Sequence, residues 1–392
     1  MRFAVADRRE SDFGGLIVMS DNIKTPYFLV DEKRLIKNLE ILKSIQDETG
    51  CRILLAQKAF SMFYAYPLIS KYLCGTTASG LYEARLGFEK FGGETHVFSP
   101  AYRKDEFDEI LNYADDIVFN SVSQVEKYGL TAKNKGKSIG LRVNPECSTQ
   151  EGHEIYDPCS VGSRLGCTID NFDESILKLL DGFHFHTLCE QNSDDLEKTA
   201  VVFEEKFGKY LHNMKWLNFG GGHHITRDDY DIERLKKVIL HFKNKYDLQI
   251  YLEPGEAVVL NAGYLKTSVL EIVRNDLNIA ILDTSAACHM PDVIEMPYRP
   301  PLQNSGLPGE KRFTYRLGGP TCLAGDVIGD YSFDSKLNEG DVLTFEDMAL
   351  YTMVKTNTFN GMKLPDIVYR NSDGRDILVK SFGYDDFKER LS

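Results

Sequence analysis

The sequence of 392 residues lacks any uninterrupted apolar run close to the roughly 18 residues of a membrane-spanning helix. Its N-terminus lacks the basic segment followed by an apolar one that marks a secretory signal. Basic residues are in the minority, 46 against 59 acidic ones, and the formal net charge of -13 disfavours nucleic acid or an anionic membrane as a partner. These absences predict a cytoplasmic protein.

Cysteine is present, but its spacing contains no CxxC pair and no zinc-knuckle pattern. We therefore expect reduced thiols in a cytoplasmic protein, of which at most one or two take part in chemistry. The eight cysteines are Cys51, Cys74, Cys147, Cys159, Cys167, Cys189, Cys288 and Cys322.

From Asp31 onward, short apolar runs typical of buried parallel strands alternate with segments of helical periodicity. The eight predicted strands are Cys51–Ala56, Thr76–Ser79, Thr95–Ser99, Asp116–Phe119, Ser138–Val143, Gly182–His186, Lys215–Phe219 and Leu248–Leu252. This alternation predicts a closed (β/α)8 TIM barrel over residues 31–260, with a doubly wound open sheet as the alternative. The barrel is favoured because polar residues follow nearly every strand, where barrel active sites assemble.

Beyond Asn261, β-branched runs broken by glycine, proline and aspartate predict a mainly β domain over residues 261–392. Residues 1–30 are expected to form a lead-in and a strand, Thr25–Val30, that joins this domain. The proline-rich residues 291–308 are expected to form an irregular loop near the site.

Two charged residues follow predicted strands at positions where they could do chemistry. Lys58 comes after the first strand, and a desolvated lysine there can form a Schiff base with an aldehyde. Glu253 ends the eighth strand and could keep a pyridine nitrogen protonated. The alternatives are a lysine that marks the strand's exit into solvent and an acidic surface turn.

Glycine and histidine residues follow two further strands. Gly220, Gly221 and Gly222 come after the seventh strand, where their backbone N–H groups could surround a phosphate, although a flexible turn is an equal alternative. His186 could stack on a planar cofactor. No acidic or cysteine partner has convincing ligand spacing, so we expect no metal site. In the β domain, Cys322 lies on a glycine-rich turn and is the thiol most suited to chemistry.

Taken in order, these residues resemble the fold-type III pyridoxal-phosphate decarboxylases, which include the ornithine, arginine and diaminopimelate decarboxylases and have an alanine-racemase-like barrel. The matching positions are Lys58, His186, Gly220–Gly222, Glu253–Gly255, Gly319–Cys322 and Tyr351. Within this group, the closest likeness is to the carboxynorspermidine and carboxyspermidine decarboxylases of polyamine biosynthesis. That likeness lies in segments Thr76–Gly87, Gly162–Gly166, Asp283–Asp292 and Pro297–Pro300.

The resemblance implies pyridoxal 5'-phosphate as cofactor and a carboxylated polyamine as substrate. By the likeness, Lys58 binds the cofactor's aldehyde, His186 stacks on its ring and Glu253 faces its ring nitrogen. The phosphate would be held by Gly220, Gly221, Gly222 and Tyr351, and Gly255 would also contact the cofactor. The resemblance also implies a homodimer in which the second subunit supplies Cys322 to the carbon that loses its carboxylate.

Two positions depart from the wider group. Glu256 stands where many relatives carry an arginine, and Leu323 replaces the acid that often follows the catalytic cysteine. The loss of that arginine puts one phosphate contact in doubt, whereas the added carboxylate suits a cationic substrate tail. The acids expected to pair with the substrate amines are Glu256, Asp292, Glu295 and Asp326, each of which could instead be a solvated surface acid.

Two rival functions remain at the level of sequence. A diaminopimelate decarboxylase needs an arginine for the substrate's second carboxylate, and Arg299 or Arg164 could provide it. A non-catalytic homologue that binds the cofactor is disfavoured because Lys58 and Cys322 are both present. The sequence does not separate a norspermidine from a spermidine precursor, because one methylene changes binding by only about 1–3 kcal/mol.

Overall fold

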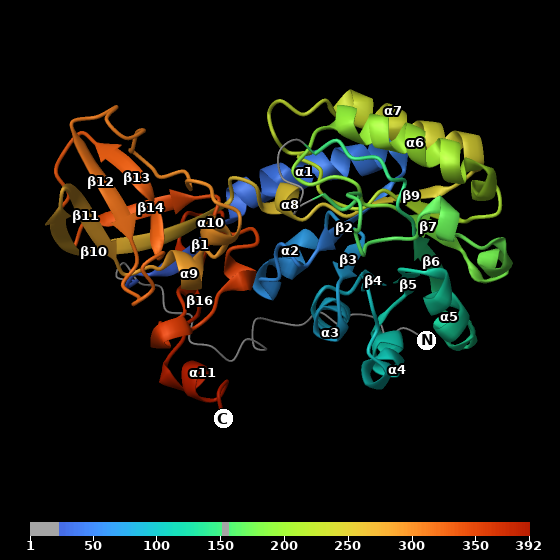
Figure 1. The fold of residues 1–392 in the computed structure, drawn as a ribbon, viewed down its shortest axis with the longest axis horizontal. Coiled ribbons are helices and arrows are strands. Elements are labelled where there is room, and N and C mark those ends of the chain that lie inside the picture. Colours follow the sequence, from blue (N-terminus) through green and yellow to red (C-terminus); the bar gives the residue numbers. More distant parts are fainter. Residues whose placement is uncertain (1–22, 151–156) are drawn as a thin grey trace. The chain divides into compact units, whose positions relative to one another are not determined.

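A computed structural model describes residues 23–150 and 157–392 (Figure 1). The first 22 residues of the predicted N-terminal lead-in lie outside the described residues. Within the described ranges, no helix combines the length and apolar character needed to cross a membrane. The described residues form two compact units, one within Arg34–Leu260 and the other joining the residues up to Lys33 to Asn261–Ser392.

The first unit is built around eight parallel strands that close into a barrel in chain order, with β2 pairing with both β3 and β9. The predicted (β/α)8 barrel is therefore confirmed. The strands are β2 (Arg52–Ala56), β3 (Gly75–Ala78), β4 (Glu94–Phe98), β5 (Asp116–Phe119), β6 (Ser138–Arg142), β7 (Gly182–His184), β8 (Trp216–Asn218) and β9 (Gln249–Leu252).

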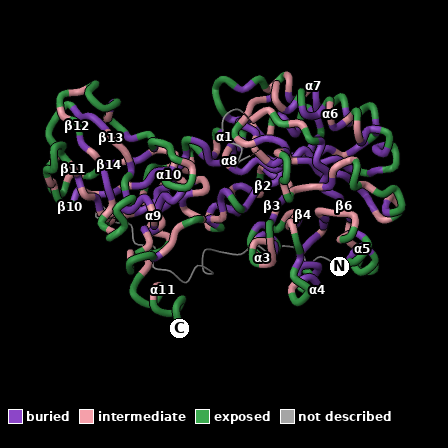
Figure 2. Tube along the Cα trace, viewed as in Figure 1, coloured by how far each residue is buried: buried purple, intermediate pink, exposed green. Residues whose placement is uncertain are grey.

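Helices of this unit bury an apolar face and expose a polar one, as the alternating colours of Figure 2 show. In α1, for example, Leu35, Leu39 and Leu42 are fully buried. The α-helices are α1 (Glu32–Thr49), α2 (Tyr66–Ile69), α3 (Leu81–Lys90), α4 (Lys104–Tyr113), α5 (Val122–Asn134), α6 (Ser193–Leu211), α7 (Ile232–Tyr246) and α8 (Glu256–Val259). The described residues of this unit also form the 3-10 segments η2 (Phe63–Ala65), η4 (Ile169–Asn171) and η5 (Glu174–Leu179).

The second unit is mainly β. Its strands are β1 (Tyr27–Asp31), β10 (Gly263–Asn275), β11 (Leu277–Leu282), β12 (Phe313–Gly318), β13 (Val327–Phe333), β14 (Val342–Glu346), β15 (Asp366–Arg370) and β16 (Asp376–Lys380). Strand β1 pairs antiparallel with β10 and parallel with β15, so the N-terminal strand belongs to this sheet. Phe28, Tyr331 and Phe345 are buried in its core.

Short helices interrupt the strands of the second unit. They are α9 (Ala286–His289), α10 (Asp292–Glu295), η6 (Met353–Lys355), η7 (Phe359–Gly361) and α11 (Tyr384–Lys388). The helix α10 lies inside the proline-rich segment that the sequence predicts to be an irregular loop, so that prediction is wrong for these four residues.

Candidate active site

Lys58 lies in the turn that follows β2, at the carboxyl end of a barrel strand. Lys58 is accessible to solvent, yet many protein atoms surround its amine. This crowding lowers the pKa of Lys58, and the charge of Arg142 lowers it further. The two observations are compatible because water can reach one side of a crowded group. A lysine with a lowered pKa is more often the free amine, which is the form that attacks an aldehyde.

Glu253 follows β9 and is held by two neighbouring strands. Asn218 Nδ2 donates to Oε1 over 2.8 Å, and His184 Nε2 lies 3.2 Å from Oε2. Burial alone would raise the pKa of Glu253, but His184 and Asn218 outweigh it and bring this pKa to about 2. The buried carboxylate is therefore ionised at neutral pH and suited to face a cationic group.

His186 presents a neutral ring. Its Nδ1 accepts a hydrogen bond from the Gly221 N–H over 3.0 Å, which places the ring proton on Nε2. Burial, followed by the charge of Lys58, holds the pKa of His186 well below its usual range. An uncharged, oriented imidazole is suited to lie against a flat ring.

The barrel brings His184, His186 and Glu253 together, with one possible ligand atom of each within 4.8 Å of the others. Sequence spacing did not reveal this grouping, because Glu253 is far from the histidines in the chain. His186 Nδ1 and both Glu253 oxygens already have protein partners. The absence of a metal site stays a prediction.

The glycine run after β8 requires glycine because the loop passes close to other backbone. A Cβ on Gly221 would lie 2.4 Å from the Glu253 carbonyl oxygen, and Gly220 and Gly222 have positive φ values of 72° and 82°. The Gly220 N–H donates to Asn218 Oδ1 and the Gly221 N–H to His186. Among the described residues, the N–H groups of Gly222 and His223 have no acceptor, so they are the donors left for an anion.

Arg142, at the end of β6, is a site residue that the sequence analysis missed. It is 6% exposed, its guanidinium lies 4.7 Å from the centre of the Phe98 ring, and Nη2 donates to the His186 carbonyl over 3.2 Å. Burial lowers its pKa to about 10. No carboxylate of a described residue forms an ion pair with it. Its position at a strand's carboxyl end was the signal that could have revealed it.

Two further barrel positions were predicted from the sequence. Gly255, after β9, passes the Lys58 turn so closely that a Cβ would lie 2.5 Å from Ala59 Cβ. Glu256 begins α8, and its Oε1 lies 3.5 Å from His224 Nε2. All the predicted barrel residues therefore lie after the carboxyl ends of barrel strands, on loops or, for Glu256, at the start of α8.

In the second unit, Cys322 lies on the loop between β12 and β13 and is exposed. Its N–H donates to Asn360 Oδ1 over 3.0 Å. Tyr351 precedes η6 and has a positive φ of 52°, an uncommon backbone conformation for a bulky residue.

Asp292 and Glu295 lie on α10 and pair with the same cation. Lys355 Nζ contacts Asp292 Oδ1 and lies 3.0 Å from Glu295 Oε2. Sequence reasoning missed Lys355 because it is 60 or more residues away in the chain. The structure therefore shows that this acid pair accommodates an alkylammonium group.

Asp326 and Arg299 make contacts within their own unit. Asp326 is buried, and its carboxylate accepts hydrogen bonds from Ser285 Oγ, the Ala287 N–H and Thr321 Oγ1. The Arg299 guanidinium lies 4.6 Å from the centre of the Tyr331 ring. These contacts give both side chains a role in holding loops of the sheet unit.

The family of the chain follows from comparison with known proteins. Residues 3–349 match the family model described as "Pyridoxal-dependent decarboxylase, C-terminal sheet domain". The chain belongs to the pyridoxal-dependent decarboxylases. The predicted resemblance is thereby confirmed, and the chain is a pyridoxal-phosphate-dependent enzyme.

Several relatives of this decarboxylase match nearly its whole length. A carboxynorspermidine/carboxyspermidine decarboxylase of Campylobacter jejuni is 43% identical, with 94% of this chain and 99% of the relative covered. A carboxyaminopropylagmatine decarboxylase of Synechocystis is 41% identical, covering 94% and 96%. The crystal structure of the Campylobacter jejuni carboxynorspermidine decarboxylase with norspermidine has a TM-score of 0.88 and 42% identity, covering 94% and 100%.

The barrel unit fits the cofactor of this family. Lys58 offers an amine of lowered pKa, Glu253 offers a buried carboxylate for a protonated ring nitrogen, and His186 offers a neutral ring. The unpaired N–H groups of Gly222 and His223 suit a phosphate, and the buried cation of Arg142 suits an anionic group nearby. These residues would hold the cofactor.

Proposed function

We propose that the enzyme decarboxylates carboxynorspermidine, carboxyspermidine or both, and so forms norspermidine or spermidine in polyamine biosynthesis. The observation that carries this proposal is sequence identity to two decarboxylases named for these substrates. The identity is 43% to one and 38% to the other, in each case over 94% of this chain. Diaminopimelate decarboxylases are more distant, at 24% identity for the relative from Methanocaldococcus jannaschii.

The barrel residues would position the reacting end of the substrate. When bound, pyridoxal phosphate supplies an electron sink for the electron pair left on the α-carbon as CO₂ departs. Lys58 would hold the cofactor through its aldehyde, and Glu253 would keep a proton on the ring nitrogen. His186 would lie against the ring. These barrel residues contribute placement and charge.

The α-carbon must gain a proton once its bond to the carboxylate has broken. Cys322 is the proposed proton donor, because its thiol is exposed on a loop. It would act from the second subunit of a homodimer, as the family likeness implies. Tyr351 would hold the cofactor phosphate together with the glycine loop.

The amines of the substrate require acidic partners. Glu256, Asp292 and Glu295 remain the proposed partners. We leave Asp326 and Arg299 out of this set, because loop contacts already engage both side chains. A pair of carboxylates would also repel the second carboxylate of diaminopimelate, which needs a cationic partner.

A second candidate substrate is carboxyaminopropylagmatine. The 41% identity to the Synechocystis enzyme named for it is close to the 43% to the Campylobacter jejuni enzyme. This substrate ends in a guanidinium rather than an ammonium group, and carboxylates can bind either.

A side-by-side decarboxylation assay tests the proposal. It would compare carboxynorspermidine, carboxyspermidine, carboxyaminopropylagmatine and diaminopimelate on the purified holoenzyme. We expect kcat/KM for a carboxylated triamine to exceed that for diaminopimelate by at least about 100-fold. Highest activity on diaminopimelate would reject the proposal, and highest activity on carboxyaminopropylagmatine would favour the second candidate.

We also propose that the enzyme works as a cytoplasmic homodimer with shared sites. Mixing inactive Lys58→Ala and Cys322→Ala chains should restore activity, because one of the two sites in a mixed dimer has both residues. The measurement is turnover after joint refolding, compared with each variant alone. No recovery would contradict the shared site.

A further inference from the structure

Three side chains from the segments that follow β7, β8 and β9 converge in the barrel unit. They are Glu190, His224 and Glu256, and one polar atom of each lies within 4.8 Å of the others. The charges of Glu190, Glu256 and Lys58 all act on the Cys189 thiol, whose pKa burial raises to about 11. The cluster therefore lies in the neighbourhood of Lys58.

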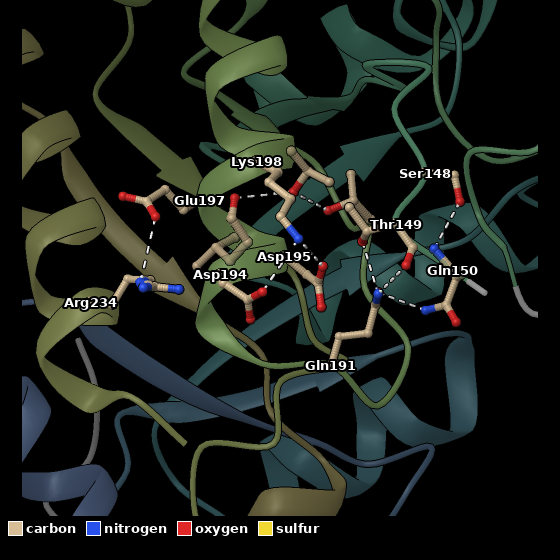
Figure 3. A network of polar contacts seen from close by, with 12 residues as sticks. Ser148, Thr149, Gln150, Gln191, Asp194, Asp195, Glu197, Lys198 and Arg234 are labelled. Atoms are coloured by element: carbon tan, nitrogen blue, oxygen red, sulfur yellow. Dashed lines mark hydrogen bonds and ion pairs between the residues drawn. The ribbon is translucent and has the colours of Figure 1, made fainter. Parts of the chain in front are cut away.

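Gln191 fixes the spacing of this cluster. Its N–H donates to the Gly222 carbonyl, and its own carbonyl accepts from the His224 N–H, both over 3.0 Å. Its side-chain amide donates to the Thr149 carbonyl over 2.8 Å and accepts from Gln150 over 2.7 Å, as Figure 3 shows. Glu190 therefore stands on a loop that is bonded to both neighbouring loops.

His224 places a buried polar atom beside Glu256 in this cluster. It is 7% exposed, and Arg227 Nη1 lies 2.9 Å from its Nδ1. Because a guanidinium can only donate, Nδ1 accepts, and the ring proton is on Nε2. Nε2 is buried, has no hydrogen-bond partner among the described residues and lies 3.5 Å from Glu256 Oε1.

We propose that Glu190 and Glu256 bind an ammonium group of the substrate, with His224 as a positioning residue that directs Glu256. This inference rests on the proposed function and adds Glu190 and His224 to its substrate contacts. Two carboxylates close together favour a cation that satisfies both. A metal ion is disfavoured, because it needs the Nε2 lone pair that the proton on Nε2 occupies.

The test uses Glu190→Gln in the holoenzyme. We expect KM for carboxynorspermidine to rise about tenfold with kcat within about twofold, since the lost contact binds the tail and not the reacting carbon. The dissociation constant of norspermidine, measured by calorimetry, should rise by a similar factor. KM for 2,4-diaminobutyrate, which has the reacting end without the aminopropyl tail, should stay within about twofold.

Glu197→Gln is the matched control, because Glu197 lies on α6 and faces Arg234 at 3.6 Å (Figure 3). It should leave all these values unchanged. Unchanged norspermidine binding in Glu190→Gln, or an equal loss in Glu197→Gln, would overturn the inference. No turnover of any carboxylated triamine by the wild-type enzyme would instead count against the proposed function, and norspermidine binding would still test the subsite.

Two further measurements test the role of His224 and the nature of the ligand. His224→Ala should weaken norspermidine binding about tenfold, and His224→Gln, whose amide can donate in place of Nε2–H, should restore it to within about threefold of wild type. Equal loss in both variants would reject the positioning role. If EDTA removes norspermidine binding by the wild type and Zn²⁺ restores it, the cluster is a metal site and the inference is wrong.

Discussion

Glu253 shows how a single buried side chain is kept ionised. Water is largely excluded from it, so the charge depends on Asn218 and His184, both of which are provided by neighbouring barrel strands. Removing the charge while keeping the shape is therefore an informative change at the scale of one residue.

Glu253→Gln should lower kcat by about 10²-fold or more, because a neutral amide cannot keep the ring nitrogen protonated. Steady-state kinetics on the holoenzyme provide the measurement. Glu197→Gln again serves as control, and far-UV circular dichroism checks that the fold is kept. A kcat within threefold of wild type would show that Glu253 does not have this role.

Which site residues can be recognised in the sequence depends on how local their signal is. Lys58, Glu253 and the glycine run each follow an apolar strand directly, so their place at the barrel's carboxyl end is readable. Glu190 and Lys355 are recognised as site residues only through partners on other segments, and local sequence patterns do not reveal those partners.

At the scale of elements, the barrel strands were predicted to within a few residues, because most are short runs rich in apolar and β-branched residues. Within the β domain, strand β13 is not evident from the sequence, since Gly329 and Asp330 interrupt its apolar pattern.

The contact between η6 and α10 yields a prediction at this scale. Lys355 neutralises Asp292 and Glu295, which are also proposed to bind substrate amines. Lys355→Met should therefore lower KM for carboxynorspermidine by about two- to fivefold at low salt, and less in 0.5 M salt, because the partly exposed pair is screened.

Lys311→Met is the control for this substitution, since Lys311 pairs with Asp334 at 2.8 Å elsewhere in the same unit. It should leave KM unchanged. A raised or unaltered KM in Lys355→Met would show that Lys355 does not compete with the substrate.

At the scale of the whole molecule, stability depends in part on a buried charge cluster inside the barrel. His96 is 1% exposed and lies 3.1 Å from Asp116 and 3.4 Å from Glu94. Burial alone would lower its pKa, but the two carboxylates outweigh it and raise this pKa to about 10. No sequence pattern indicated this cluster.

This cluster predicts how stability varies with pH. Because the folded-state pKa of His96 exceeds its unfolded value of about 6.5, its stabilisation is complete below pH of about 6.5 and is lost as pH rises toward 10. His96→Gln should therefore lower the free energy of unfolding most at pH 6.5, and the deficit should shrink toward pH 10. Urea unfolding at several pH values measures it, with the exposed His212→Gln as control. A deficit independent of pH would contradict the assigned charge.

The most direct test of the whole account is the covalent state of Lys58. Borohydride reduction of the purified holoenzyme, followed by peptide mass spectrometry, should find the reduced pyridoxyl phosphate group on Lys58 and on no other lysine. Reduction should also remove the cofactor's visible absorbance, and Lys58→Ala should carry no such adduct. An unmodified Lys58, with the adduct on a different lysine, would contradict the account.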